Sequence, residues 1–343
     1  MNSYIISANA SIKDALVSLN NIAYDTLSLL VVNADGQMVG SLTDGDIRRG
    51  LISGAQLTEE VSTIMHRDFK YIKQSEFDVA HLKSFRDRRI FFIPILDEER
   101  HIVEIVNLQK YKSHLPIDAV LMAGGKGERL RPLTEKTPKP LLEVGGKCII
   151  DHNVDHLISY GVKHINVTIN YLGEQIEEHF ATPREGIQIR TFREPKFLGT
   201  IGSIKFVDTL YNDTVLVMNS DLFTNIDYED FFLHFQKHDA EMSVAAVPYN
   251  VSIPYGILDL EGREIKGLIE KPKYNYYANA GIYLIKKHAL AEIPEDEFFN
   301  ATDLIEKLIA QNKKVIRYPL NGTWIDIGNP QEFQKAQDLV KHM

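Results

Sequence analysis

The 343-residue sequence has a single cysteine, Cys148, and no long apolar run. One cysteine excludes an internal disulfide framework and suits a reducing compartment. The longest apolar stretches, such as residues 27–32 and 90–96, are far shorter than the roughly 20 residues that cross a bilayer. The first residues lack a basic start followed by an apolar core, so they do not resemble a signal peptide. We therefore expect a cytoplasmic protein that makes no membrane contact.

The chain also lacks an excess of positive charge. A net charge of -9 argues against a nonspecific grip on nucleic acid or on an anionic membrane, although a local basic pocket for phosphates stays open. The composition, with 44% hydrophobic and 25% charged residues, is ordinary for a globular protein. Since single cores usually stop growing before about 250–300 residues, a chain of 343 residues has room for two domains.

Two segments near the N-terminus look alike at an offset of roughly 64 residues. Each predicts a helix, a strand, a turn, a second strand and a helix, and Asp35-Gly36 supplies the turn chemistry in the first copy. This repeat resembles a tandem pair of CBS domains, an α+β module, over residues 1–112. The resemblance implies an adenine nucleotide bound in a cleft between the copies. It also implies self-association, so we expect a homo-oligomer.

Thr43 and Asp46, in the stretch GSLTDGDI, match the residues that such modules place against ribose and phosphate. The second copy has Asn107 and Lys110 in the corresponding places, so we expect one competent cleft at most. A purely structural reading stays open, in which Thr43 caps the following helix and Asp46 lies near its positive end.

From residue 117 the sequence alternates between apolar strands and amphipathic helices. This alternation predicts an α/β domain with a largely parallel, doubly wound sheet, extended by antiparallel strands from the later segments. Pro116 marks a break before the first strand, so we place this domain at residues 117–343.

The stretch LMAGGKGERLRPLTEKTPKPLLEVGGK follows the first of these strands. Gly124, Gly125 and Gly127 would let backbone N–H groups approach and cradle a triphosphate. Arg129 adds fixed positive charge, and Lys139 sits between two prolines that stiffen the segment. Because no Lys-Ser/Thr pair follows the last glycine, and because the glycines are spaced differently from GxGxxG, this is neither a P-loop nor a dinucleotide fingerprint.

These residues resemble the signature of the sugar-phosphate nucleotidyltransferases, GGxGTRLxPLTxxxPKPLxxVxGKP, with Glu128 and Cys148 as departures. The resemblance covers about two thirds of the chain and implies a Rossmann-like, GT-A-like mixed sheet. It assigns catalysis to Arg129, Lys139 and Lys271. It assigns nucleotide binding to Leu121, Ala123, Gly124, Gly125, Gly127, Glu194, Gly199 and Thr200, and sugar binding to Tyr255, Gly256, Glu270 and Asn279.

The same resemblance makes Asp221, at the end of an apolar strand, and Asp326, in TWIDIGNP, the ligands of a Mg²⁺ ion. Two carboxylates can hold this ion while water and phosphate oxygens complete its octahedron. A lone aspartate at a strand end is more often a cap, so the metal reading depends on the phosphate loop nearby.

Glu194 is the residue that the resemblance places against the base. A carboxylate only accepts hydrogen bonds, and guanine offers it two donors, N1–H and the exocyclic amine. Thymine and uracil offer one N3–H between two carbonyl oxygens, which a carboxylate repels. We therefore expect GTP as the nucleotide.

The expected reaction joins the nucleoside monophosphate of GTP to a sugar 1-phosphate and releases pyrophosphate. The CBS fusion resembles the guanylyltransferases that act on glucosamine 1-phosphate in legionaminic acid synthesis, so this sugar is our first expectation. Mannose 1-phosphate and heptose 1-phosphate stay open. Two other classes also stay open: a catalytically silent nucleotide-sensing protein, and a glycosyltransferase that consumes a nucleotide sugar.

Overall fold

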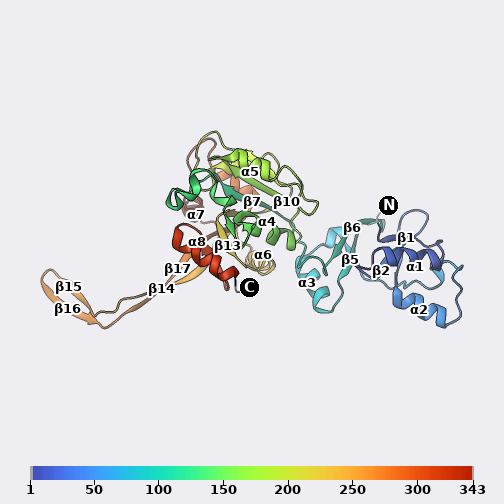
Figure 1. Cartoon of the computed structure of the whole chain (residues 1–343). Coiled ribbons are helices and arrows are strands. Elements are labelled where there is room, and N and C mark those ends of the chain that lie inside the picture. Colours follow the sequence, from blue (N-terminus) through green and yellow to red (C-terminus); the bar gives the residue numbers. More distant parts are fainter. Residues whose placement is uncertain (1–2, 342–343) are drawn as a thin grey trace. The chain divides into compact units, whose positions relative to one another are not determined.

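In the computed structural model, which describes residues 3–341, the chain forms two compact units (Figure 1). One unit ends at His114 and the other begins at Leu115. No helix among the described residues has the length and apolar content needed to cross a membrane.

The N-terminal unit contains two three-stranded sheets that share one topology. In the first sheet β2 lies between a parallel β1 and an antiparallel β3, and in the second β5 lies between a parallel β4 and an antiparallel β6. Leu30 and Met38 of the first sheet and Leu96 of the second meet in one buried cluster. The elements are β1 (Ile5–Ser7), α1 (Ile12–Asn21), β2 (Ser28–Val32), β3 (Met38–Thr43), α2 (Asp44–Ile52), β4 (Ile72–Lys73), α3 (Val79–Asp87), β5 (Phe92–Leu96) and β6 (Ile102–Asn107).

The C-terminal unit is built on a seven-stranded sheet of order β11-β10-β7-β12-β17-β14-β18, in which only β17 runs against its neighbours. The chain passes from β7 to β10 and β11 on one side and returns to β12 on the other, so the direction of winding switches beside β7. Its main elements are β7 (Ile117–Ala123), α4 (Ile149–Ser159), β10 (His164–Ile169), α5 (Gly173–His179), β11 (Arg190–Arg193), β12 (Thr214–Asn219), α6 (Tyr228–Lys237), β14 (Met242–Ser252), β17 (Lys273–Lys286), α7 (Ala301–Ala310) and β18 (Val315–Pro319).

Both faces of this sheet are buried, because the central strands are apolar at nearly every position rather than at alternate ones. Val120 and Val217 pack with Leu304 of α7 in one cluster, and Leu121 and Leu216 are buried as well. Helices therefore cover the sheet on both sides, and the open edge for a ligand is the one formed by the carboxyl ends of the strands.

A small antiparallel ladder, β13 (Leu222–Thr224) with β19 (Trp324–Asp326), lies next to the end of β12. Leu142 and Phe223 share a buried cluster with Ile325 and with Ala336 of α8 (Pro330–Val340). The terminal helix thus fixes the strand that carries Asp326 against the strand that follows Asp221. A short hairpin, β8 (Glu143–Val144) with β9 (Lys147–Cys148), precedes α4.

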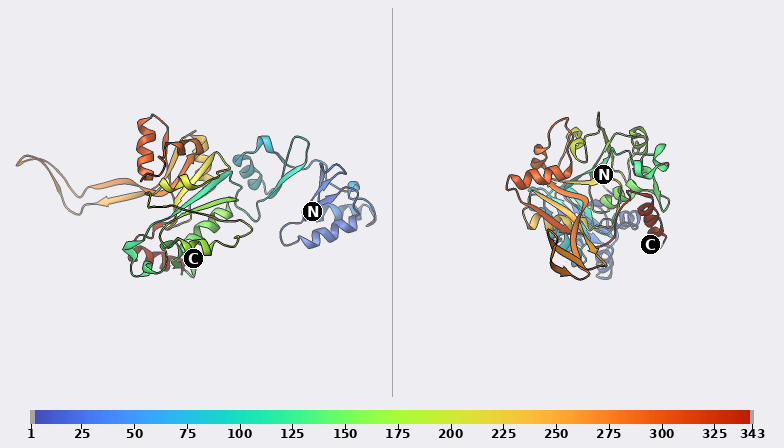
Figure 2. Two further views of the ribbon diagram at one scale, coloured as in Figure 1. Left: turned by 90° about the horizontal axis from the view of Figure 1, so that it is seen from above. Right: turned by 90° about the vertical axis from the view of Figure 1, so that its left-hand side faces the viewer.

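β14 and β17 continue well past the edge of the sheet as a two-stranded hairpin (Figures 1 and 2). Continuous burial along the strands ends at Ala246 on β14 and at Ala280 on β17. The tip is a second antiparallel pair, β15 (Ile257–Glu261) with β16 (Glu264–Ile269). We call residues 248–277 the arm.

Candidate active site

A pocket of about 600 Å³ opens at the carboxyl ends of β7, β10, β11 and β12. Loops that follow parallel strands meet at this edge, next to the point where the winding direction switches, which is where open α/β sheets bind ligands. Ten of the sequence-predicted residues line it: Ala123, Gly124, Gly125, Gly127, Arg129, Lys139, Glu194, Gly199, Thr200 and Asp221.

The glycine-rich loop packs directly on the segment that carries Lys139. Gly127 has a φ of 61°, and a Cβ atom there would lie 3.2 Å from Lys139 Cβ and 3.0 Å from Thr134 Cγ2. Thr134 Oγ1 donates to the Gly127 carbonyl at 2.8 Å. A glycine is therefore required both by the backbone conformation and by the close approach of Lys139.

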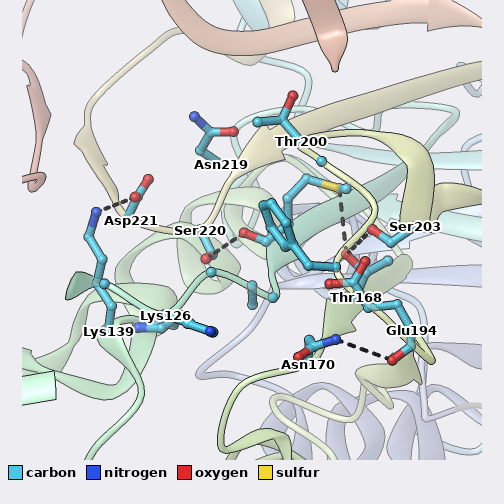
Figure 3. A pocket seen from close by; sticks show the side chains of 18 of the residues that line it. Lys126, Lys139, Thr168, Asn170, Glu194, Thr200, Ser203, Asn219, Ser220 and Asp221 are labelled. Atoms are coloured by element: carbon cyan, nitrogen blue, oxygen red, sulfur yellow. Dashed lines mark hydrogen bonds and ion pairs between the residues drawn. The ribbon is translucent and has the colours of Figure 1, made fainter. Parts of the chain in front are cut away.

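Lys139 and Asp221 form an ion pair at one end of the pocket (Figure 3). The ammonium contacts Asp221 Oδ2, and Lys139 as a whole is only 8% exposed. Asp221 Oδ1 is buried and has no hydrogen-bond partner among the described residues. One carboxylate oxygen is thus satisfied by the lysine, and the other is available to a ligand.

Asp326 lies beside Asp221 because of the β13–β19 ladder. Leu222 is opposite Asp326, and the Asp221 carbonyl accepts from Ile327 N at 3.2 Å. Burial raises the pKa of Asp326, the Asp221 carboxylate raises it further, and the cations of Lys139 and Arg129 oppose the rise. Two carboxylates that repel each other, one with an orphaned buried oxygen, are a fitting pair of ligands for a divalent cation.

Arg129 lies against the backbone that follows Asp326. A Cβ atom on Gly328 would be 2.9 Å from Arg129 Nη2, and both residues line the pocket. Arg129, Lys139 and Asp221 therefore line the pocket together, and Asp326, which does not line it, is close enough for the charges of all three to affect its pKa. Cations and a carboxylate are thus neighbours in this part of the pocket wall.

Glu194 lies on the opposite side of the pocket from Asp221 (Figure 3). It is 4% exposed, and Leu198 N donates to its Oε2 at 3.2 Å. Burial raises the pKa of Glu194 to about 7, against the lowering effect of the Leu198 N–H. A Cβ atom on Gly124 would come within 2.2 Å of Glu194 Oε1, so this glycine leaves room for the carboxylate.

Gly199 and Thr200 are held by the segment before α7. A Cβ atom on Gly199, whose φ is 81°, would lie 2.6 Å from the Phe299 carbonyl oxygen. The Thr200 hydroxyl accepts from Ala301 N at 2.9 Å, and Asn300 Oδ1 accepts from Thr200 N at 3.2 Å. The backbone of Gly199 and Thr200 therefore forms this wall of the pocket, and the N-terminus of α7 holds it in place.

Leu121 and Asn279 lie near the pocket but do not line it. Leu121 is fully buried inside β7, one residue before the pocket wall begins at Met122. The Asn279 amide donates to Tyr283 Oη at 2.9 Å, and its Oδ1 accepts from Gly281 N at 2.9 Å. These contacts tie Asn279 to its own strand.

Four predicted residues are not brought to the pocket: Tyr255, Gly256, Glu270 and Lys271 lie on the arm. Tyr255 is 73% exposed, and the side chains of Glu270 and Lys271 are 66% and 69% exposed. The expectation that they line the pocket of their own chain does not hold in this structure. The reason is the β14–β17 ladder, which carries the segment away from the sheet edge (Figure 1).

The sequence reasoning missed a set of polar residues at the ends of the pocket-forming strands. Asn170 follows β10, Asn219 ends β12 and Ser220 follows it. The buried Ser203 hydroxyl donates to Thr168 Oγ1 at 3.0 Å. Asn170 also donates from its amide to the Glu194 carbonyl at 3.4 Å. The available signal was a polar residue directly after an apolar strand.

Thr43 and Asp46 form a reciprocal capping box at the start of α2. Thr43 Oγ1 accepts from Asp46 N at 3.2 Å, and Asp46 Oδ2 accepts from Thr43 N at 2.8 Å. Asp46 also pairs with Arg49 at 2.5 Å. These contacts account for the motif structurally, in the way that the capping alternative describes, and the regulatory nucleotide stays a prediction.

Comparison with known sequences agrees with this class of fold. The profile of the nucleotidyl transferase family matches residues 118–342, and the chain belongs to that family. The CBS domain profile matches residues 1–53, so a CBS domain precedes the transferase part. Catalytic subunits beta of mannose-1-phosphate guanylyltransferase from Danio rerio and Xenopus tropicalis are each 30% identical over 230 residues, or 63% of this chain. The matched region spans 62% of the length of either relative.

Solved structures confirm the predicted fold class. HddC from Yersinia pseudotuberculosis superposes with a TM-score of 0.52 at 24% identity, covering 65% of this chain and 99% of HddC. The same protein complexed with GMP-PN gives a TM-score of 0.51. At this identity the likeness establishes the mixed α/β sheet and does not transfer residue roles.

Proposed function

We propose that this protein transfers GMP from GTP to a sugar 1-phosphate and releases pyrophosphate. The observation that carries the proposal is the distribution of charge in the pocket: a buried carboxylate, Glu194, lies on one side. The cations Lys139 and Arg129 lie with the Asp221 carboxylate on the other. A nucleotide has the same polarity, with a base that offers hydrogen-bond donors and a charged polyphosphate.

The Glu194 side suits guanine. Glu194 Oε1 faces the pocket beside Gly124, and Oε2 is held by Leu198 N, so the carboxylate is fixed before the base arrives. Ionised, it can accept from guanine N1–H and from the exocyclic amine. The relatives named for guanylyl transfer, and the solved complex with GMP-PN, support the same choice of base.

The opposite end suits the triphosphate. The amides of the glycine loop and the Arg129 guanidinium would hold the departing pyrophosphate, and Lys139 would exchange part of its pairing with Asp221 for the α-phosphate. Asp221 and Asp326 would hold a Mg²⁺ ion, which when bound neutralises phosphate charge. A bond forms between a phosphate oxygen of the sugar 1-phosphate and the α-phosphorus, and the bond from that phosphorus to the bridging oxygen breaks.

The sugar is the least determined part. The relatives named above act on mannose 1-phosphate by name, which supports an alternative that the sequence left open better than it supports glucosamine 1-phosphate. We therefore put mannose 1-phosphate first and keep glucosamine and heptose 1-phosphates as competitors.

A pyrophosphate-release assay with each of the four NTPs and each sugar 1-phosphate tests the proposal. We expect release with GTP and one sugar phosphate, and GDP-sugar as the product by mass spectrometry. Release with UTP or dTTP in preference to GTP would contradict the role of Glu194. No release with any pair would favour a silent sensor or a nucleotide-sugar-consuming glycosyltransferase, and the release of GDP from a GDP-sugar then identifies the latter.

A further inference from the structure

The tip of the arm presents an apolar face that no other described part of the C-terminal unit covers. Leu258 is opposite Leu268, and Leu260 is opposite Ile265, so the four side chains share one side of the β15–β16 pair. Their exposed fractions run from 49% to 62%. An isolated two-stranded hairpin is marginal in water, and exposed apolar patches mark contact surfaces. The arm therefore needs a partner surface.

The arm cannot bring its functional residues to the pocket of its own chain as a rigid body. Beyond Ala246, β14 pairs with β17 without a register shift down to Ser252 opposite Lys273. At about 3.3 Å per residue, Tyr255 lies roughly 30 Å beyond Ala246. Bringing Tyr255 to the pocket of its own chain would require breaking the hydrogen bonds between β14 and β17.

The ladder of the arm is interrupted between Ser252 and Ile257 on one strand and between Ile269 and Lys273 on the other, and a register shift lies farther out, between Asp259 and Leu260. Lys271, with a φ of 44°, is part of this break. A rotation about the break moves the tip but leaves Glu270 and Lys271, which lie at the pivot, where they are. Hinge motion therefore does not complete the site in the same chain.

We propose that the arm docks on a second copy of this chain and places Glu270 and Lys271 at the sugar-phosphate side of that copy's pocket. The proposal rests on the function proposed above, since it assigns the sugar phosphate to those two side chains. Every copy has one arm and one pocket that lacks these residues. Two copies related by a two-fold axis can therefore exchange arms and complete both sites.

The rim of the pocket offers a matching apolar surface. Phe197 lines the pocket, and its ring lies 5.9 Å from that of Phe298 in an edge-to-face pair. The two side chains are 53% and 58% exposed, although both are large and apolar. Apolar residues at the tip of the arm would cover this pair, while the Lys271 ammonium would add to the pocket a cation for the phosphate of the sugar.

Mixing two inactive variants tests the exchange. Lys271→Ala damages the arm, and Asp221→Asn damages the pocket, and each alone should lose about a hundredfold or more in kcat. If arms are exchanged, a mixed dimer has one site with an intact pocket and an intact arm. Random pairing of equal amounts then restores about a quarter of the wild-type activity per chain. Activity that stays at the level of the two single variants overturns the proposal.

A cross-linking experiment gives a readout that does not depend on activity. Leu268→Cys and Phe298→Cys, each in a Cys148→Ser background and with a different affinity tag, are mixed and oxidised. We expect a disulfide-linked heterodimer, and none when Asp259→Cys, on the other face of the tip, replaces Leu268→Cys. If the wild type shows no transferase activity with any substrate, the proposed function fails, while cross-linking still decides whether the arm docks. Absence of the heterodimer overturns the docking.

Discussion

The β13–β19 ladder brings Asp326 near Asp221: Leu222 is opposite Asp326, the Asp221 carbonyl accepts from Ile327 N, and the Asp221 carboxylate raises the pKa of Asp326. Two acids from segments that are distant in the sequence are thus brought close together. Asp221 Oδ1 has no hydrogen-bond partner among the described residues, and the pKa of Asp326 is raised by burial and by the Asp221 carboxylate, two features that agree with the Mg²⁺ site proposed above.

Asp326→Asn should lower the affinity for a divalent metal ion at least about tenfold. Even substitutions of residues that contact only the metal ligands commonly lower metal affinity by that factor. The chain's single tryptophan, Trp324, lies two residues before Asp326 and donates from Nε1 to the Ala280 carbonyl at 2.9 Å. Mn²⁺ quenching of its fluorescence can therefore report the metal without substrate. Asp35→Asn, an exposed aspartate of the other unit, is the matched control. Equal quenching in both variants would contradict the assignment of the metal site.

Lys139→Met should lower both activity and stability. Removing one partner of a largely buried ion pair leaves the other charge uncompensated, at a cost of about 3 kcal/mol. The double variant Lys139→Met/Asp221→Asn removes both charges and should recover most of the loss in Tm, while kcat stays at least about a hundredfold down. Thermal unfolding and pyrophosphate release measure the two effects. A double variant less stable than Lys139→Met would show that the pair is not the reason for the loss.

Glu194 should make GTP binding depend on pH near neutrality. Its pKa is raised to about 7, so the carboxyl group is mostly protonated at pH 6 and mostly ionised at pH 8. If only the ionised form accepts both guanine donors, the KM for GTP should fall about tenfold between pH 6 and pH 8, in proportion to the competent fraction.

Glu194→Gln is the control for this titration, because an amide does not ionise in this range. Its KM for GTP should be higher and nearly independent of pH. The same raised pKa means that ionisation of Glu194 opposes folding as pH rises from 4.5 toward about 7. The Gln variant should therefore lose less stability than the wild type over that interval. An identical pH profile of KM in both proteins would rule out Glu194 as the titrating group.

Variants of Thr43 can distinguish a helix-capping residue from a residue that binds a regulatory nucleotide. Thr43→Val removes the hydroxyl that accepts from Asp46 N, and should cost about 1 kcal/mol of stability. Thr43→Asn keeps a good N-cap but replaces the hydroxyl that would contact the nucleotide with an amide side chain. Calorimetry with AMP, ADP and ATP then decides: a nucleotide that binds the wild type but neither variant supports the regulatory site, and binding that only tracks stability supports the cap alone.

Much of the site could be predicted from local sequence. The glycines after β7, Lys139 between two prolines and Glu194 before LGT are positions where a short stretch of chain already has a shape and a charge suited to phosphate or base. The alternation of strands and helices also predicts the sheet correctly, because burial on both faces requires continuous apolar strands.

Other features were decided by contacts between distant segments. Strand pairing and register determine that Asp221 lies near Asp326 and that Asp221 Oδ1 has no hydrogen-bond partner among the described residues. They also determine that the buried Ser203 hydroxyl donates to Thr168. The local sequence does not determine the strand register, because many strand pairings are compatible with the same pattern of apolar residues. The course of the arm is the clearest case: the residues of IEKP are recognisable by themselves, but only the β14–β17 ladder determines that Glu270 and Lys271 lie far from the pocket of their own chain.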